Sequence, residues 1–135
     1  MNVTIAGSGI AGGYLARLLE RKGINVDIYD GMDHDTRCRC RSCGWGAPTG
    51  IKTYLADVGL DFNDYLIEPM SPMNFDGLMA KTPLCTLNKP RLIKDLARGT
   101  GLKQQNLEPE GADSYNIVVD APASPGLSCP PAGPI

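Results

Sequence analysis

The sequence predicts an α/β fold with a parallel sheet, and its first 30 residues carry most of the prediction. Residues 2–6 and 24–29 are short, β-branched and apolar, which is typical of buried strands. Between them, residues 10–22 place apolar side chains at helical spacings, and Gly23 provides a helix stop. A strand, a helix and a second strand form a βαβ unit, whose right-handed crossover makes the two strands parallel neighbours.

The later elements are expected in the following order: a long loop over 31–50, a helix over 50–58 that stops at Gly59, an irregular segment over 69–73, a strand near 74–80, a helix over 89–98 and a strand over 115–120. Asn88 is a suitable cap for the helix over 89–98, and Pro90 falls in its first turn, where proline is tolerated. We therefore expect one domain over 1–121, followed by a proline-rich tail over 122–135.

Composition and charge argue against several classes of protein. The 135 residues are 42% hydrophobic and 21% charged, as in ordinary globular domains, and the net charge of -2 gives no basic footprint for nucleic acid. No run of 18 apolar residues is present, so no membrane span is predicted. Five cysteines, an odd number without a secretory context, favour a reduced, cytoplasmic location over a disulfide scaffold.

The most informative motif lies between the first strand and the first helix. Gly7-Ser8-Gly9-Ile10-Ala11-Gly12 has the form G-x-G-x-x-G in the context that dinucleotide binding requires. Gly7 would allow the tight turn, Gly9 the approach of a pyrophosphate and Gly12 the close packing of helix on strand. The helix amino terminus attracts the phosphates.

The second strand ends at Asp30-Gly31, where a carboxylate can accept hydrogen bonds from ribose hydroxyls. An acidic residue at this position favours a free 2′-hydroxyl. The motif therefore predicts a Rossmann-type domain and leaves two cofactors open, FAD and NAD(H).

A cysteine-rich loop, residues 38–46, admits three interpretations. His34 with three cysteines could ligate a metal, although the irregular C-x-C-x-x-C spacing disfavours it and we predict no metal site. Neighbouring arginines could activate a thiol for redox chemistry. The third interpretation is reduced cysteines in a loop that faces a cofactor, with Trp45 either in the core or beside an aromatic ring. With a single histidine, no nucleophilic set can be assigned; the catalytic residues stay unknown and chemistry would belong to a bound cofactor.

Two further segments extend the pattern: Cys43-Gly44-Trp45-Gly46, and the basic helix that begins Lys89-Pro90-Arg91. With the glycine motif and the strand ending in Asp120-Ala121, they make residues 1–121 resemble the amino-terminal part of the geranylgeranyl reductase family of FAD-dependent oxidoreductases, especially its archaeal branch. The resemblance implies FAD held by Gly7, Gly9 and Gly12 at the pyrophosphate and by Asp30 at the ribose. It also implies Arg91 near the phosphates and Cys43 to Gly46 near the flavin ring.

That family reduces carbon–carbon double bonds of isoprenoid lipids, with hydride from the flavin and a redox donor such as ferredoxin or reduced nicotinamide. Its members meet lipid at the membrane surface without spanning the bilayer. The present sequence departs from the family after Asp120-Ala121, where Pro122-Ala123 replaces Thr-Gly, and it carries no substrate domain. The sequence thus predicts a truncated FAD-binding domain. The alternatives are an NAD(H)-binding domain, a non-catalytic nucleotide-binding module completed by another polypeptide, and a zinc module built on His34.

Overall fold

The computed structural model describes residues 1–31, 45–69, 72–81 and 83–121. Its larger sheet has four strands in the order β8-β2-β1-β9, and every neighbouring pair is parallel. The strands are β1 (Asn2–Ala6), β2 (Asn25–Tyr29), β8 (Gly101–Lys103) and β9 (Ile117–Asp120). The expected βαβ unit is confirmed, and the strand order is that of the first four strands of a Rossmann-type sheet.

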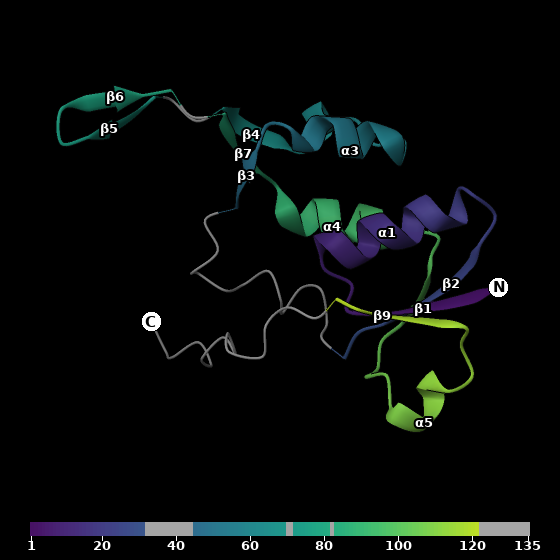
Figure 1. The fold of residues 1–135 in the computed structure, drawn as a ribbon. Helices are drawn as coiled ribbons and strands as arrows, with labels where there is room; N and C mark the ends of the chain where they lie inside the picture. Colours follow the sequence, from purple (N-terminus) through teal and green to yellow (C-terminus); the bar gives the residue numbers. More distant parts are fainter. Residues whose placement is uncertain (32–44, 70–71, 82, 122–135) are drawn as a thin grey trace, which may run out of the picture.

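Helices cover both faces of this sheet (Figure 1). Helix α1 (Ile10–Glu20) packs beside α4 (Lys89–Ala97) on one face, and the short α5 (Pro109–Ala112) lies on the other. The α1 face is apolar because alternate residues of the central strands point toward the helix; they form a buried cluster of Val3, Ile5, Val26 and Ile28 with Ala16. This alternation is the two-residue period of a strand.

A smaller antiparallel sheet, in the order β3-β7-β4, lies beyond the two helices. It comprises β3 (Gly46–Pro48), β4 (Leu66–Pro69) and β7 (Leu84–Leu87), with α3 (Ile51–Asp57) and the 3-10 helix η1 (Phe62–Asp64) alongside. A second core joins this sheet to α3 and α4 through Leu55, Leu87 and Leu92. Strands β5 (Met73–Phe75) and β6 (Leu78–Ala80) form a hairpin that projects from this end (Figure 1).

Helix starts and stops follow the sequence closely. Asn88 caps α4 by accepting a hydrogen bond from the amide of Arg91 at 3.1 Å, and Gly23 and Gly59 end their helices in the left-handed conformation. Two expectations were wrong. Residues 74–80 form no single strand, because Asp76 and Gly77, both at positive φ, turn the chain into the β5–β6 hairpin. The loop over 31–50 and the irregular segment over 69–73 overlap β3, β4 and β5 at their ends.

Within the described part of the chain, no helix is long and apolar enough to cross a membrane.

Candidate functional site

The glycine loop makes a sharp turn between β1 and α1. Gly7 has a φ of 108°, which favours glycine, and its amide donates to the carbonyl of Tyr29 at 2.8 Å. A Cβ on Gly12 would lie 2.0 Å from the Gly7 carbonyl oxygen and 3.3 Å from Cγ2 of Ile5. Only glycine at position 12 lets α1 begin this close to β1. The structure therefore has the tight turn and the close packing expected of Gly7 and Gly12.

Gly9 differs from the other two glycines of the motif. It is the N-cap of α1, with φ -63° and ψ -174°, a backbone that any residue can adopt. Its lack of a side chain is thus not required by its own conformation. The fold itself explains the glycines at positions 7 and 12. The approach of a ligand to the loop would explain the glycine at position 9. Ile10 and Ala11 follow in the first turn of α1, whose leading amides have no partner within the helix.

Asp30 is tied to the glycine loop by two short hydrogen bonds. Its Oδ2 accepts from the amide of Ser8 at 2.6 Å and from the Ser8 hydroxyl at 2.5 Å. Both residues are buried, so these bonds fix the loop against the end of β2. The contact of Asp30 with a cofactor ribose stays a prediction. The sequence motifs do not indicate this bond, although the parallel strands that end at Ala6 and Tyr29 place positions 8 and 30 side by side.

Three of the predicted cofactor-binding segments lie side by side at the carboxyl edge of the sheet. Ala6 is paired with both Tyr29 and Asp120, so the glycine loop is flanked by Asp30-Gly31 on one side and Asp120-Ala121 on the other. The amide of Ala121 donates to the Ala6 carbonyl at 2.8 Å. Ligands of open α/β sheets bind at this edge.

Asn106 is a neighbour of this edge that the sequence analysis missed. A Cβ on Gly31 would lie 2.2 Å from its Oδ1. Glycine at position 31 thus lets the Asn106 amide approach the chain just after Asp30. No local signal identifies this contact, because Asn106 follows β8 and meets Gly31 only through the pairing of β8 with β2.

Arg91 is engaged on the side of the smaller sheet. Its Nη1 donates to the carbonyl of Asp64 at 3.0 Å, its guanidinium carbon lies 5.6 Å from the centre of the Tyr65 ring, and its Nε is 3.8 Å from Asp95 Oδ2. These contacts fix Arg91 against η1 and along α4. Its expected place near cofactor phosphates stays a prediction.

Trp45 and Gly46 stand at the start of β3, and Cys43 and Gly44 lie outside the described residues. Trp45 has a φ of 53°, which is unusual for a large side chain, and its carbonyl accepts from the amide of Leu87 at 3.1 Å. Such backbone conformations cost energy and are concentrated at ligand-binding sites. The metal and redox interpretations of the cysteine loop also fall outside the described residues.

A polar cluster on the sheet face opposite α1 also escaped the sequence analysis. Lys103 Nζ lies 2.8 Å from Asp27 Oδ2 and 3.0 Å from the Tyr29 hydroxyl, and the Tyr115 hydroxyl donates to the same Asp27 oxygen. The hydrogen bonds from Lys103 and Tyr115 lower the pKa of Asp27. Hydrogen bonding to Asp27 and Tyr29 raises the pKa of Tyr115 to about 12. The cluster ties β2 and β8 to the segment that leads into β9.

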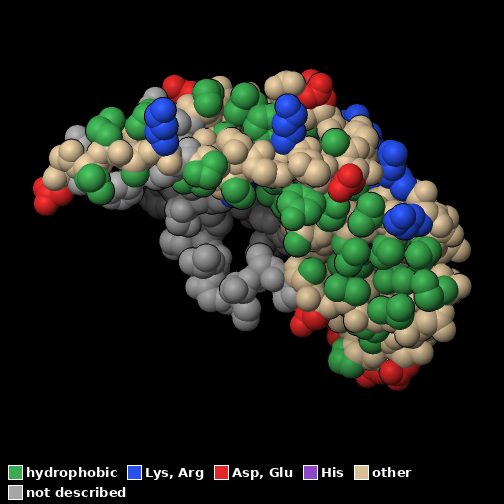
Figure 2. All heavy atoms as spheres, turned by 45° about the horizontal axis from the view of Figure 1, so that its top comes forward, with side chains coloured by type: hydrophobic (Ala, Val, Ile, Leu, Met, Phe, Trp, Pro, Cys, Tyr) green, Lys and Arg blue, Asp and Glu red, His purple; other side chains and the backbone are tan. Residues whose placement is uncertain are grey.

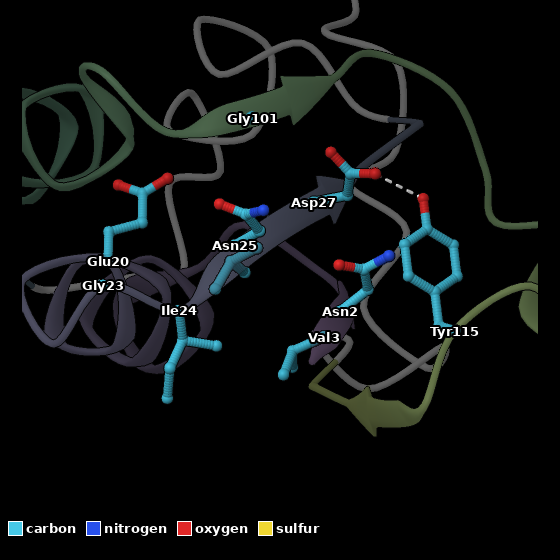
Figure 3. Close-up of a pocket in the computed structure, with 10 residues that line it drawn as sticks. Asn2, Val3, Glu20, Gly23, Ile24, Asn25, Asp27, Gly101 and Tyr115 are labelled. Atoms are coloured by element: carbon cyan, nitrogen blue, oxygen red, sulfur yellow. Dashed lines mark hydrogen bonds between the residues drawn. The ribbon is translucent and has the colours of Figure 1, made fainter.

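The same face borders a cavity of about 590 Å³ at the amino-terminal edge of the sheet. Figure 3 shows Glu20, Asn25, Asn2 and Asp27 around it, with Tyr115 reaching Asp27 from the side. The glycine loop lies at the other end of the same strands. Because ligands of parallel sheets bind at the carboxyl edge, the volume of this cavity does not identify it as the cofactor site.

No protein-family profile matches the chain. It is 28% identical over 116 residues to an uncharacterized protein of Methanocaldococcus jannaschii, covering 81% of this chain and 31% of that protein. Among solved structures it is similar to 2-methyl-3-hydroxypyridine-5-carboxylic acid oxygenase, with a TM-score of 0.53 to a mutant and 0.52 to the tetrameric form, both at 18% identity. In each case the match covers 76% of this chain and 30% of the oxygenase chain. The chain thus spans less than a third of each of these proteins. The structural likeness, with the strand order, establishes an α/β Rossmann-type fold with a parallel sheet.

Proposed function

We propose that this chain binds FAD at the carboxyl edge of its parallel sheet and is the cofactor-binding part of an oxidoreductase. The observation that carries the proposal is the glycine loop, which is turned at Gly7, closely packed at Gly12 and held to Asp30 through Ser8. The likeness of the fold to an oxygenase supports this class of protein.

Each part of the loop has a role in this proposal. The amides at the start of α1 face the pyrophosphate, because a helix amino terminus carries unpaired N–H groups and partial positive charge. Gly9 leaves the backbone open to the phosphates, and Asp30 orients the ribose. Asp120 and Ala121 border the other side of the loop. When bound, the flavin would supply hydride transfer, and the chain's own residues bind and orient it.

We further propose that the oxidoreductase reduces carbon–carbon double bonds of isoprenoids, as the geranylgeranyl reductases do. It rests on the resemblance in Cys43 to Gly46 and in the helix around Arg91. In this proposal Trp45 lies beside the flavin ring, and its unusual backbone conformation supports a specific role. The substrate would be a lipid met at the membrane surface from the cytoplasm, and electrons would come from ferredoxin or reduced nicotinamide.

The test is a binding titration of the purified protein with FAD, NADH and ADP, together with its absorption spectrum after reconstitution. We expect a flavin spectrum and tighter binding of FAD than of NADH. Gly9→Val should abolish binding, because its side chain would meet the pyrophosphate; its extended backbone angles permit valine, and circular dichroism establishes that the variant is folded. Gly50→Ala is the matched control, since Gly50 is also a helix N-cap, in the smaller sheet's helix, and has nothing within 4 Å of the added Cβ.

Three results would each contradict a different part of the proposal. Tighter binding of NADH than of FAD would replace the flavin with a nicotinamide cofactor while leaving the cradle in place. Failure of the folded wild-type protein to bind FAD, NADH or ADP would remove the dinucleotide site altogether. A protein that binds ADP or FAD but shows no turnover with any donor would favour a nucleotide-binding module without catalysis.

A further inference from the structure

We propose that Asn106 binds the base of the cofactor's adenosine, with its carboxamide accepting a hydrogen bond from the adenine amine and donating one to a ring nitrogen. This role rests on the proposed dinucleotide site, with the pyrophosphate at the glycine loop and the ribose at Asp30. Asn106 would then be the residue that selects adenine over other bases.

The carboxyl ends of three neighbouring strands lie in a row. The order β8-β2-β1 places the glycine loop after β1, Asp30 after β2 and Asn106 just after β8. Neighbouring strands lie about 4.8 Å apart, a step that a base attached to the ribose can cover. A cofactor that runs from the glycine loop to Asp30 therefore places its base over the end of β8.

The backbone after β8 turns Asn106 toward β2. The carbonyl of Lys103 accepts from the amide of Asp30 at 3.0 Å and from the amide of Gln105 at 2.9 Å. Asn106 then lies against Gly31, where an added Cβ would be 2.2 Å from its Oδ1 and 3.3 Å from its Nδ2. Both polar atoms of the carboxamide are thus held beside the residue that follows Asp30, and glycine at position 31 leaves room for them.

The carboxamide of Asn106 suits adenine chemically. Asn106 is exposed, and its side chain has no hydrogen-bond partner among the residues that the structure describes. A carboxamide carries a donor and an acceptor on one planar group. Adenine presents an amine donor next to a ring nitrogen acceptor, and asparagine pairs with both at once.

Charge also favours a neutral group at this end of the sheet. Glu108 is the N-cap of α5 and Glu110 lies in its first turn, whereas the nearby ammonium of Lys103 is paired with Asp27 at 2.8 Å. Figure 2 shows Asp and Glu side chains at the lower end of the molecule, where α5 lies in Figure 1. Because like charges repel, phosphates are disfavoured here and favoured at the positive amino terminus of α1. The uncharged base fits the position of Asn106.

The experiment is calorimetric titration of the 135-residue protein with ADP and with purine riboside 5′-diphosphate, which lacks the adenine amine. We expect the wild type to bind ADP about tenfold more tightly than the analogue. Asn106→Ala should remove this preference and weaken ADP binding by a factor of about ten or more.

A second variant and a control test the placement of the carboxamide. Gly31→Ala should also remove the preference, because the new methyl group displaces the Asn106 side chain and meets no backbone atom among its nearest contacts. Asn25→Ala is the matched control, since Asn25 is also exposed but lies at the amino-terminal end of β2. That variant should leave both affinities unchanged. Circular dichroism establishes that the variants are folded.

Failure of the role of Asn106 and failure of the dinucleotide site give different results. If the wild type binds both nucleotides equally, or if Asn106→Ala keeps the preference for ADP, Asn106 does not bind the base and the dinucleotide site still stands. Loss of the preference in Asn25→Ala to the same extent would overturn the role of Asn106 as well. If the folded wild type binds neither nucleotide, the dinucleotide site itself is overturned, and the role of Asn106 with it.

Discussion

Replacing Gly12 with alanine places a methyl group where the fold leaves no space for it. The new Cβ would lie 2.0 Å from the carbonyl oxygen of Gly7, whereas ordinary contact begins at 3.4 Å. The two atoms must therefore separate by about 1.4 Å. The obstacle is backbone, and Cγ2 of Ile5 closes a second direction at 3.3 Å, so no side-chain rotation relieves the clash.

The expected cost follows from this geometry. Forcing an extra methyl group into a packed region costs about 1–3 kcal/mol, and more when backbone must move. Because α1 must move away from β1, we expect Gly12→Ala to lower the free energy of unfolding by about 3 kcal/mol or more. A typical domain has only about 5–15 kcal/mol in total, so the variant would be near the limit of folding.

Urea unfolding followed by circular dichroism measures the effect. Gly50→Ala serves again as the control, because its φ of -59° suits alanine and its added Cβ meets nothing within 4 Å. That variant should be neutral or more stable by about 0.4–1 kcal/mol, through the reduced entropy of the unfolded chain. If the free energy of unfolding of Gly12→Ala lies within about 0.5 kcal/mol of the wild-type value, the change behaves as an ordinary surface substitution and the close packing of the loop is refuted.

Three further outcomes are expected. Ser8→Ala removes the hydroxyl bond to Asp30 and keeps the amide bond, so the free energy of unfolding should fall by about 1.5–3 kcal/mol. Asp30→Ala removes both bonds and should cost more, so an equal loss in the two variants would contradict this reasoning. Hydrogen bonds from Lys103 and Tyr115 lower the pKa of Asp27, so its carboxylate stabilises the fold at pH values above its unfolded-state pKa, and this stabilisation is lost as the pH falls through its lower folded-state pKa. Lys103→Met should therefore make the urea midpoint depend less steeply on pH on the acid side, and an unchanged slope would count against the cluster. Cys85 is buried, and burial raises the pKa of its thiol, so the reactive thiolate is scarce in the native protein. After treatment with iodoacetamide, mass spectrometry should find Cys85 unmodified in the native protein and modified in urea; rapid labelling of the native protein would show that the core is open.

Local patterns predicted the elements whose sequence signal is local. Strands β1 and β2, helix α1 and the stop at Gly23 follow from side-chain periodicity and from one residue that favours positive φ. The cap of α4 follows from the side chain of Asn88 alone. Strands β3, β4, β7 and β8 were missed because each has three or four residues and becomes a strand only by pairing with a distant segment. The Asp76-Gly77 turn was a readable hairpin signal that the single-strand interpretation passed over.

The sequence by itself determined the βαβ unit, the glycine loop with its sharp turn, and the acidic residue that follows β2. These follow from steric limits on the backbone and from the period of apolar residues, which act within a few positions along the chain. Tertiary structure alone decided which residues distant in the sequence the polar side chains contact. Pairing of β2 with β8 brings Lys103 to Asp27, and pairing of β1 with β2 brings Ser8 to Asp30. Among the described strands, the order of the sheet also places β9 beside β1, because the neighbours of a strand depend on the arrangement of the whole sheet and not on its own residues.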